Sequence, residues 1–119
     1  MPSLTAVTGA ATAAFSAALV VAPTLLIRPC GLPDDRGTRA LVRMVGVRDV
    51  VSGVALGTAR PGRPRRAALA GRVACDWTDA AALAAGLAGR ERRALVTVSA
   101  LTWGLVCLAA GVLDERAGR

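Results

Sequence analysis

Histidine, lysine and tyrosine are absent from this sequence of 119 residues, and phenylalanine occurs only once. Without histidine the chain cannot form a Ser-His-Asp triad or a histidine metal site, and without lysine it cannot form a Schiff base or a Walker-type phosphate site. The three cysteines, at positions 30, 75 and 107, follow neither a Cys-x-x-Cys spacing nor a zinc pattern. We therefore expect no metal and no cofactor.

Apolar residues, by contrast, are unusually abundant. They make up 54% of the chain, and 13 glycines come in addition. A soluble domain reaches about 45–50% apolar residues only when glycine is included in the count. The length suits a single domain, residues 1–119. This composition favours a protein of the membrane over a soluble globular domain.

All fifteen basic residues are arginine, and the net charge is +7. The arginines gather mainly in short runs between apolar segments, in residues 60–66 and 90–93. They form no basic helix face and are not interleaved with aromatic residues, so we expect no nucleic-acid partner. Short basic loops beside apolar segments are typical of membrane topology.

Four apolar segments have the length of a membrane span, and they cover residues 4–27, 40–59, 67–87 and 94–113. A bilayer core of about 30 Å is crossed by roughly 20 helical residues. The sequence thus predicts an all-α, integral membrane four-helix bundle with antiparallel, up-down spans, in the cell membrane as a multi-pass protein. A cleaved signal peptide is the alternative for the first segment, but no basic residue precedes it and it is long for that role.

The four segments differ in how readily they should enter lipid. The first and fourth contain no charge, whereas the second and third contain three charges each. A charge at the centre of a span costs about 2.5–3.5 kcal/mol on the insertion scale. We expect the two charged segments to insert poorly alone and to lie behind the other two. A chain with only two or three spans is the alternative.

The six interior charges sum to zero, which is typical of a paired interior because an unpaired charge in lipid is costly. In a hairpin that turns near residues 62–63, Asp49 and Asp76 lie at the same depth, and Arg43 lies within about one helical turn of Asp79. The predicted network consists of Arg43, Arg48, Asp49, Arg72, Asp76 and Asp79.

Glycines form stripes along the second and fourth segments, at Gly46, Gly53, Gly57, Gly104 and Gly111. Small residues allow helices to approach closely in lipid, and Gly53-x-x-x-Gly57 is a GxxxG pattern. The stripes indicate either packing inside the bundle or a face between copies of a homo-oligomer.

One pattern in the second and third segments resembles a known family. It reads Arg43-x-x-Gly46-x-Arg48-Asp49-x-x-x-Gly53, and Asp76-x-x-Asp79-Ala80 and Gly86 follow it. This pattern is similar to that of the domain of unknown function 4267 family, small integral membrane proteins with four helices. The resemblance implies a membrane location and points to the charged positions and Gly46, but it supplies no activity.

Three functions are consistent with these features. The charges and glycines can specify how the helices assemble, as in a structural or assembly subunit. Alternatively, Asp49, Asp76 and Asp79 are candidate catalytic acids and bases of a membrane-embedded isomerase, cyclase or hydrolase acting on a lipid-soluble substrate. The third hypothesis is a small proton-coupled carrier. Arginine counts on the two sides are equal, and the dense basic turn at residues 60–66 favours cytoplasmic termini.

Overall fold

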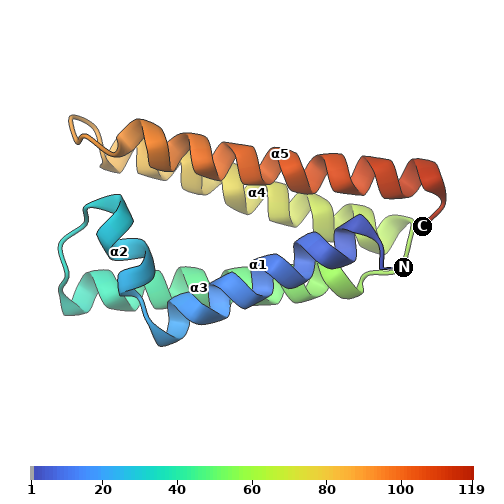
Figure 1. The fold of residues 1–119 in the computed structure, drawn as a ribbon, viewed down its shortest axis with the longest axis horizontal. Coiled ribbons are helices and arrows are strands. Elements are labelled where there is room, and N and C mark those ends of the chain that lie inside the picture. Colours follow the sequence, from blue (N-terminus) through green and yellow to red (C-terminus); the bar gives the residue numbers. More distant parts are fainter. Residues whose placement is uncertain (1) are drawn as a thin grey trace.

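The computed structural model describes residues 2–119, and within this range the chain is all-α without strands (Figure 1). The helices are α1 (Leu4–Val21), α2 (Thr24–Cys30), α3 (Arg36–Thr58), α4 (Arg63–Gly86) and α5 (Arg93–Ala117). The four long helices run up and down in sequence order, so both chain ends lie at the same end of the molecule as the α3–α4 turn. The short helix α2 lies at the opposite end.

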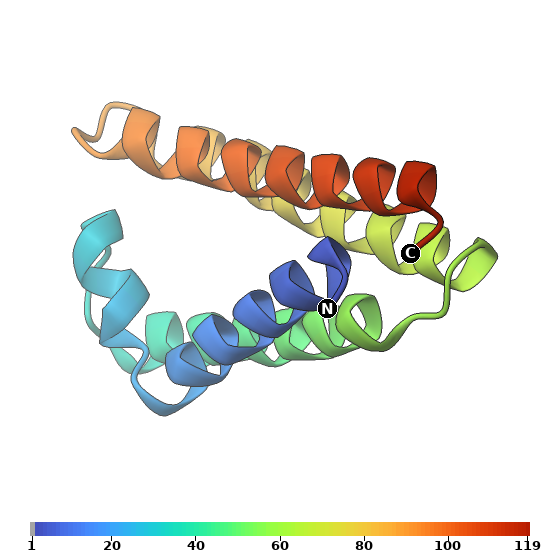
Figure 2. The same ribbon diagram turned by 45° about the vertical axis from the view of Figure 1, so that its right-hand side comes forward.

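The long helices form two layers (Figure 2). Helix α1 packs extensively on α3, and α4 packs on α5, whereas contacts between the two pairs are fewer. The pairs lie close together near the chain termini and spread apart toward α2. The molecule is consequently elongated, with dimensions of 45 × 26 × 20 Å.

Local signals in the sequence set the helix boundaries. The Ser3 hydroxyl accepts a hydrogen bond from the Ala6 backbone N–H at the start of α1, and the Asp35 carboxylate accepts one from Thr38 at the start of α3. The bond from the Thr38 backbone lowers the pKa of Asp35. Gly31 ends α2 in the left-handed conformation, with φ 66°, which a residue with a Cβ rarely adopts.

The predicted first span, residues 4–27, is wrong in one respect, because it is not a continuous helix. Helix α1 ends at Val21, Ala22 has φ −131° and ψ 81°, and the chain turns into α2 at Pro23. Proline has no N–H to donate, and its ring disfavours helical geometry in the residue before it. The seven residues Thr24–Cys30 therefore form a separate helix, α2, across the end of the bundle.

Helices α1 and α3 meet backbone to backbone at glycines. A Cβ added to Gly53 would lie 2.7 Å from the backbone nitrogen of Ala13 and 2.8 Å from the carbonyl oxygen of Gly9. Gly46 faces Val20 and Ser16 of α1 in the same way. The glycine stripe of α3 is thus covered by α1 within the same chain.

The glycines of α5 have a similar position against α4. A Cβ on Gly104 would lie 2.9 Å from the indole nitrogen of Trp77, and Gly111 lies against the side chain of Leu69. The glycines expected to pack helices therefore all lie at helix contacts inside the described chain, although a Cβ added to Gly57 would have more room, 3.6 Å from its nearest neighbours.

Both ends of α1 are bonded by charged side chains from other helices. The buried carboxylate of Asp114, near the end of α5, accepts hydrogen bonds from the backbone N–H groups of Leu4 at 3.1 Å and Thr5 at 2.7 Å. At the other end, Arg43 of α3 donates to the carbonyl oxygen of Val20 at 3.1 Å. An anion at the first turn and a cation at the last complement the helix dipole.

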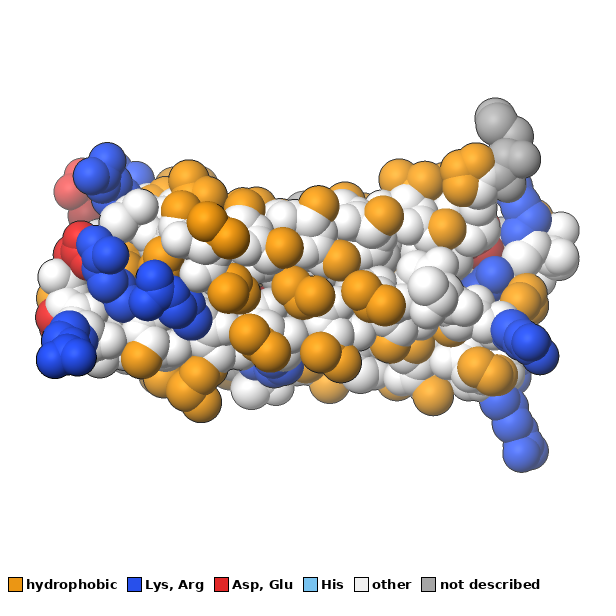
Figure 3. Space-filling view, turned by 90° about the horizontal axis from the view of Figure 1, so that it is seen from below, with side chains coloured by type: hydrophobic (Ala, Val, Ile, Leu, Met, Phe, Trp, Pro, Cys, Tyr) orange, Lys and Arg blue, Asp and Glu red, His pale blue; other side chains and the backbone are white. Residues whose placement is uncertain are grey.

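Two helices of the described chain, Leu4–Val21 and Arg93–Ala117, are long and apolar enough to cross a membrane. Helices α3 and α4 have sufficient length, but their charges keep them below that criterion, so the four predicted spans are supported in part. On the face that Figure 3 shows, basic side chains gather mainly at the two ends of the molecule, and hydrophobic side chains are spread along the surface between them.

Candidate functional site

Five of the six predicted interior charges form a continuous series of ion pairs between α3 and α4, which we call the charge chain. Its members, in order of contact, are Asp79, Arg48, Asp49, Arg72 and Asp76. Arg48 lies 2.6 Å from Asp79 and 2.9 Å from Asp49, measured between nitrogen and oxygen. The charge chain spans the gap between the two helix pairs.

Arg72 is the centre of the charge chain. It donates two hydrogen bonds to Asp76, of 2.6 and 3.1 Å, one turn along the same helix. It also lies 3.1 Å from Asp49 of α3 and donates to the Ser52 hydroxyl at 2.6 Å. The guanidinium is 1% exposed, so its charge depends on these partners rather than on water.

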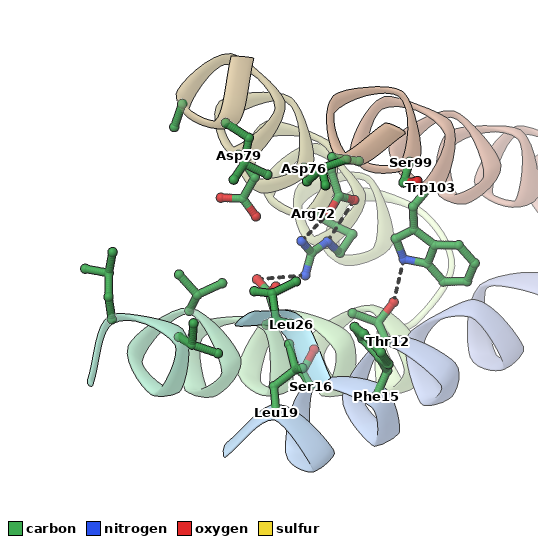
Figure 4. A pocket seen from close by; sticks show the side chains of 18 of the residues that line it. Thr12, Phe15, Ser16, Leu19, Leu26, Arg72, Asp76, Asp79, Ser99 and Trp103 are labelled. Atoms are coloured by element: carbon green, nitrogen blue, oxygen red, sulfur yellow. Dashed lines mark hydrogen bonds and ion pairs between the residues drawn. The ribbon is translucent and has the colours of Figure 1, made fainter. Parts of the chain in front are cut away.

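The helical spacing explains why these residues meet. Arg72, Asp76 and Asp79 share one face of α4 because they are separated by four and three residues. Asp49 and Asp76 are equidistant from the α3–α4 turn, which brings both carboxylates to the level of Arg72. Figure 4 shows Arg72 extending from α4 toward α3, with Asp76 and Asp79 on its own helix.

Arg43 lies outside the charge chain, because its side chain is bonded to the Val20 carbonyl at the end of α1. The expected pairing of Arg43 at the level of Asp79 is therefore not found; Arg48 occupies that position. The charge chain contains three carboxylates and two guanidinium groups, a net charge of −1 when all are ionised. The predicted neutral interior thus has one more acid than base.

A cavity of about 630 Å³ lies beside the charge chain, between the two helix pairs, and we call it the cleft. Its walls are mainly apolar and come from α1, α2, α3, α4 and α5, with Leu19, Leu26, Val45, Leu83 and Val96 among them. Arg72 and the three carboxylates also line it. A volume of this size suits a small organic molecule.

Uncharged polar groups line the cleft on the opposite side, from α1 and α5. The indole N–H of Trp103 donates to the Thr12 hydroxyl at 3.0 Å, and Ser16 and Ser99 also line the cavity (Figure 4). None of these residues was predicted from the sequence. For the residues of α1, a signal was present in the sequence. Polar residues recur at helical spacing along this otherwise apolar helix, and they are its buried polar residues: Thr5, Thr8, Thr12 and Ser16.

The chemistry available in the cleft is ionic and hydrogen-bonding. Within residues 2–119, no group of three histidine, cysteine, aspartate or glutamate side chains is arranged to hold a metal ion. The three candidate acids do come together, but each is paired with arginine: Asp76 with Arg72, Asp79 with Arg48, and Asp49 with both. An apolar cavity with one carboxylate-rich wall is suited to binding an amphiphilic molecule.

Comparison of the chain with protein-family models, with curated proteins and with solved structures found no match in any of the three.

Proposed function

We propose that the chain is a multi-pass membrane protein in which α1, α3, α4 and α5 all cross the bilayer. The support is the direction in which residue types face. The outer face of α3 is apolar, with four exposed residues, Leu41, Met44, Val51 and Val54. Its polar residues Asp49 and Ser52 instead face α4, where both contact Arg72. A soluble bundle has the opposite arrangement, with its apolar stripe inside.

Helix α4 supports the same proposal. Its outward positions between Arg66 and the end of the helix are mostly alanine and glycine, together with the half-exposed Trp77. Its charges, Arg72, Asp76 and Asp79, belong to the charge chain. Charged residues of membrane helices characteristically face the bundle interior and pair there.

The topology follows from this proposal. Both chain ends and the arginine-rich α3–α4 turn lie at one end of the bundle. We place that end on the cytoplasmic side of the cell membrane, because basic clusters in short loops favour that side. The glycine faces of α3 and α5 are already covered within the chain, so they supply no argument for a homo-oligomer.

We infer that the function is binding of a lipid-soluble molecule in the cleft, with the charge chain holding the two helix pairs around it. The single observation that carries this inference is the apolar cavity of about 630 Å³ at the level of paired interior charges. Ligand sites of this kind combine apolar walls with a few polar groups that orient the ligand.

The geometry favours binding over acid–base catalysis. A general acid and a general base need carboxyl groups in contrasting surroundings. Asp49 and Asp76 instead share the guanidinium of Arg72, at 3.1 and 2.6 Å. The charge chain consequently holds the two helix pairs together and helps to recognise the ligand. The hypothesis that these residues serve assembly is kept in this sense.

The two tryptophans allow a direct test in lipid nanodiscs. Trp103 lines the cleft, whereas Trp77 does not line it and is half exposed on α4, beside Gly104 of α5. In a Trp77→Phe variant, 12-bromododecanol should quench Trp103 fluorescence to a saturating value at a fixed ratio of probe to protein. In a Trp103→Phe variant, quenching of Trp77 should rise in proportion to the probe dissolved in the bilayer.

A matched pair of substitutions on α5 provides the control. Ala100→Leu should reduce the saturable quenching of Trp103, because Ala100 lines the cleft. Ala109→Leu should leave it unchanged, because Ala109 is exposed on another part of the same helix. Quenching of Trp103 that does not saturate, or that is equally sensitive to both substitutions, would contradict binding in the cleft.

A further inference from the structure

The cleft and the charge chain together indicate what kind of molecule the cleft accepts. Apolar residues of every helix line most of the cavity. The charges that line it are those of Arg72 and of three carboxylates, Asp49, Asp76 and Asp79. The wall that bears them is thus predominantly anionic, even though Arg48 lies behind it.

Asp79 carries the least compensated of these charges. Its Oδ2 accepts the 2.6 Å bond from Arg48, which also bonds Asp49, whereas Asp76 receives two bonds from Arg72. The side chain of Asp79 is 25% exposed and lines the cleft, in contrast to 9% exposure for Asp76. Asp79 is therefore the acid most accessible to a group entering the cleft.

An excess negative charge in an apolar setting is costly unless a cation or a proton neutralises it. Two other arginines bond backbone carbonyls outside the charge chain: Arg43 bonds the Val20 carbonyl, and Arg93 bonds the Ala84 carbonyl. A ligand that brings its own positive charge would satisfy the charge chain, and its hydrocarbon part would fill the apolar walls.

We propose that the cleft selects amphiphilic cations, molecules with an ammonium-type head group on a hydrocarbon body, and that Asp79 contacts the head group. This proposal rests on the proposed binding function and specifies its ligand class. Arg72 holds Asp49 and Asp76 in place, so these two carboxylates orient the site rather than contact the head group directly.

Three probes that differ only in their head group test the proposal on the Trp77→Phe chain in phosphatidylcholine nanodiscs. They are 12-bromododecyltrimethylammonium, 12-bromododecanol and 12-bromododecanoate, and partition into empty nanodiscs is measured and subtracted for each. We expect the cation to give saturable quenching of Trp103 at a concentration about tenfold or more below that of the alcohol, because unit charges attract strongly near a protein surface. The carboxylate should bind most weakly.

Substitution of the acid then assigns the contact. Asp79→Asn should make the cation and the alcohol bind within about twofold of each other, while binding of the alcohol itself is retained. Asp34→Asn is the matched control, because Asp34 lies in the α2–α3 loop and bonds Arg39. It should leave the preference for the cation intact. Circular dichroism of each variant verifies that the helices are formed.

The possible outcomes separate this proposal from the one on which it rests. If the Trp77→Phe chain, with all its acids intact, binds the cation and the alcohol equally, the cation proposal is overturned. Binding in the cleft remains supported in that case. Tightest binding of the carboxylate would overturn the cation proposal as well, since it would show that the guanidinium groups dominate. Absence of saturable quenching with all three probes would overturn both proposals. Should Asp79→Asn fail to fold, the comparison of head groups still decides.

Discussion

The two faces of α3 make contacts of opposite kinds. Toward α1 the contact is close, with Gly53 against the backbone of Gly9 and Ala13. Toward α4 the contact is sparse, and long charged side chains such as Arg48 and Arg72 span the distance. Helix α3 therefore makes two different contacts. Its contact with α1 has no space for a methyl group, and its contact with α4 is held open by ion pairs.

This difference explains where the cleft forms. Glycine contacts gain dispersion energy only when the backbones touch, so they exclude any cavity. A guanidinium between two helices holds them apart by the length of its side chain and binds them together at the same time. The cavity of about 630 Å³ lies on the charged side of α3, beside Arg72 and Asp49. The open contact is the one with capacity for a ligand.

The largest effect is expected from removal of the central cation. Arg72→Met should destabilise the protein by about 3–5 kcal/mol, because Asp76 loses both of its bonds and remains buried with an uncompensated charge. Unfolding in mixed micelles with increasing denaturing detergent, followed by circular dichroism, measures the change. The double variant Arg72→Met, Asp76→Asn should recover part of the loss.

Arg36→Gln is the control for this prediction, because Arg36 is exposed at the first residue of α3. Its effect should be small, as is usual for a surface substitution. Equal stability of Arg72→Met and the unsubstituted protein would show that the α3–α4 contact does not depend on the charge chain.

A smaller effect is expected at the close contact of α1 and α3. Gly53→Ala should cost about 1–3 kcal/mol, because the added methyl group meets backbone atoms of α1 at 2.7 and 2.8 Å and these cannot rotate away. Gly57→Ala is the matched control within the same GxxxG pattern. A Cβ there would lie 3.6 Å from its neighbours, an ordinary contact, so this variant should retain nearly full stability. A loss of the same size in both variants would place the close contact elsewhere.

The smallest effect is expected at Arg43, whose side chain bonds α1 at the close contact of α1 and α3. Arg43→Gln should cost about 0.3–1 kcal/mol, the usual value of a cation at a helix C-terminus. The loss should decrease as salt concentration rises, unlike the loss caused by Arg72→Met. If Arg43→Gln proved as damaging as Arg72→Met, Arg43 would have to be counted among the interior charges.

Part of this arrangement could be predicted from the sequence. Periodicity and length predict helices over most of the chain, and equal distance from the α3–α4 turn brings Asp49 and Asp76 to one level. Both carboxylates contact Arg72 as a result. These inferences succeed because they depend only on the rise of a helix and the position of a turn.

The remaining features depend on rotation and tilt of the helices, which periodicity leaves undetermined. Arg43 and Arg48 are both close to the level of Asp79, but only Arg48 faces α4, since Arg43 turns to the end of α1. Gly9 and the interaction of Asp114 with α1 were not foreseen either, because each involves a partner far along the chain. The cleft itself results from the spread of the two layers, for which no single segment carries a signal.

The pair of charged side chains that bond the ends of α1 has a consequence for the order of events during synthesis. Helix α1 precedes the other helices in the chain, but the carboxylate that accepts its first N–H groups belongs to Asp114 of α5, 109 residues after Thr5. The arginine at its other end, Arg43, comes from the next long helix. The N-terminal turn of α1 therefore reaches its final bonding only after α5 has been made, about 110 residues later in the chain.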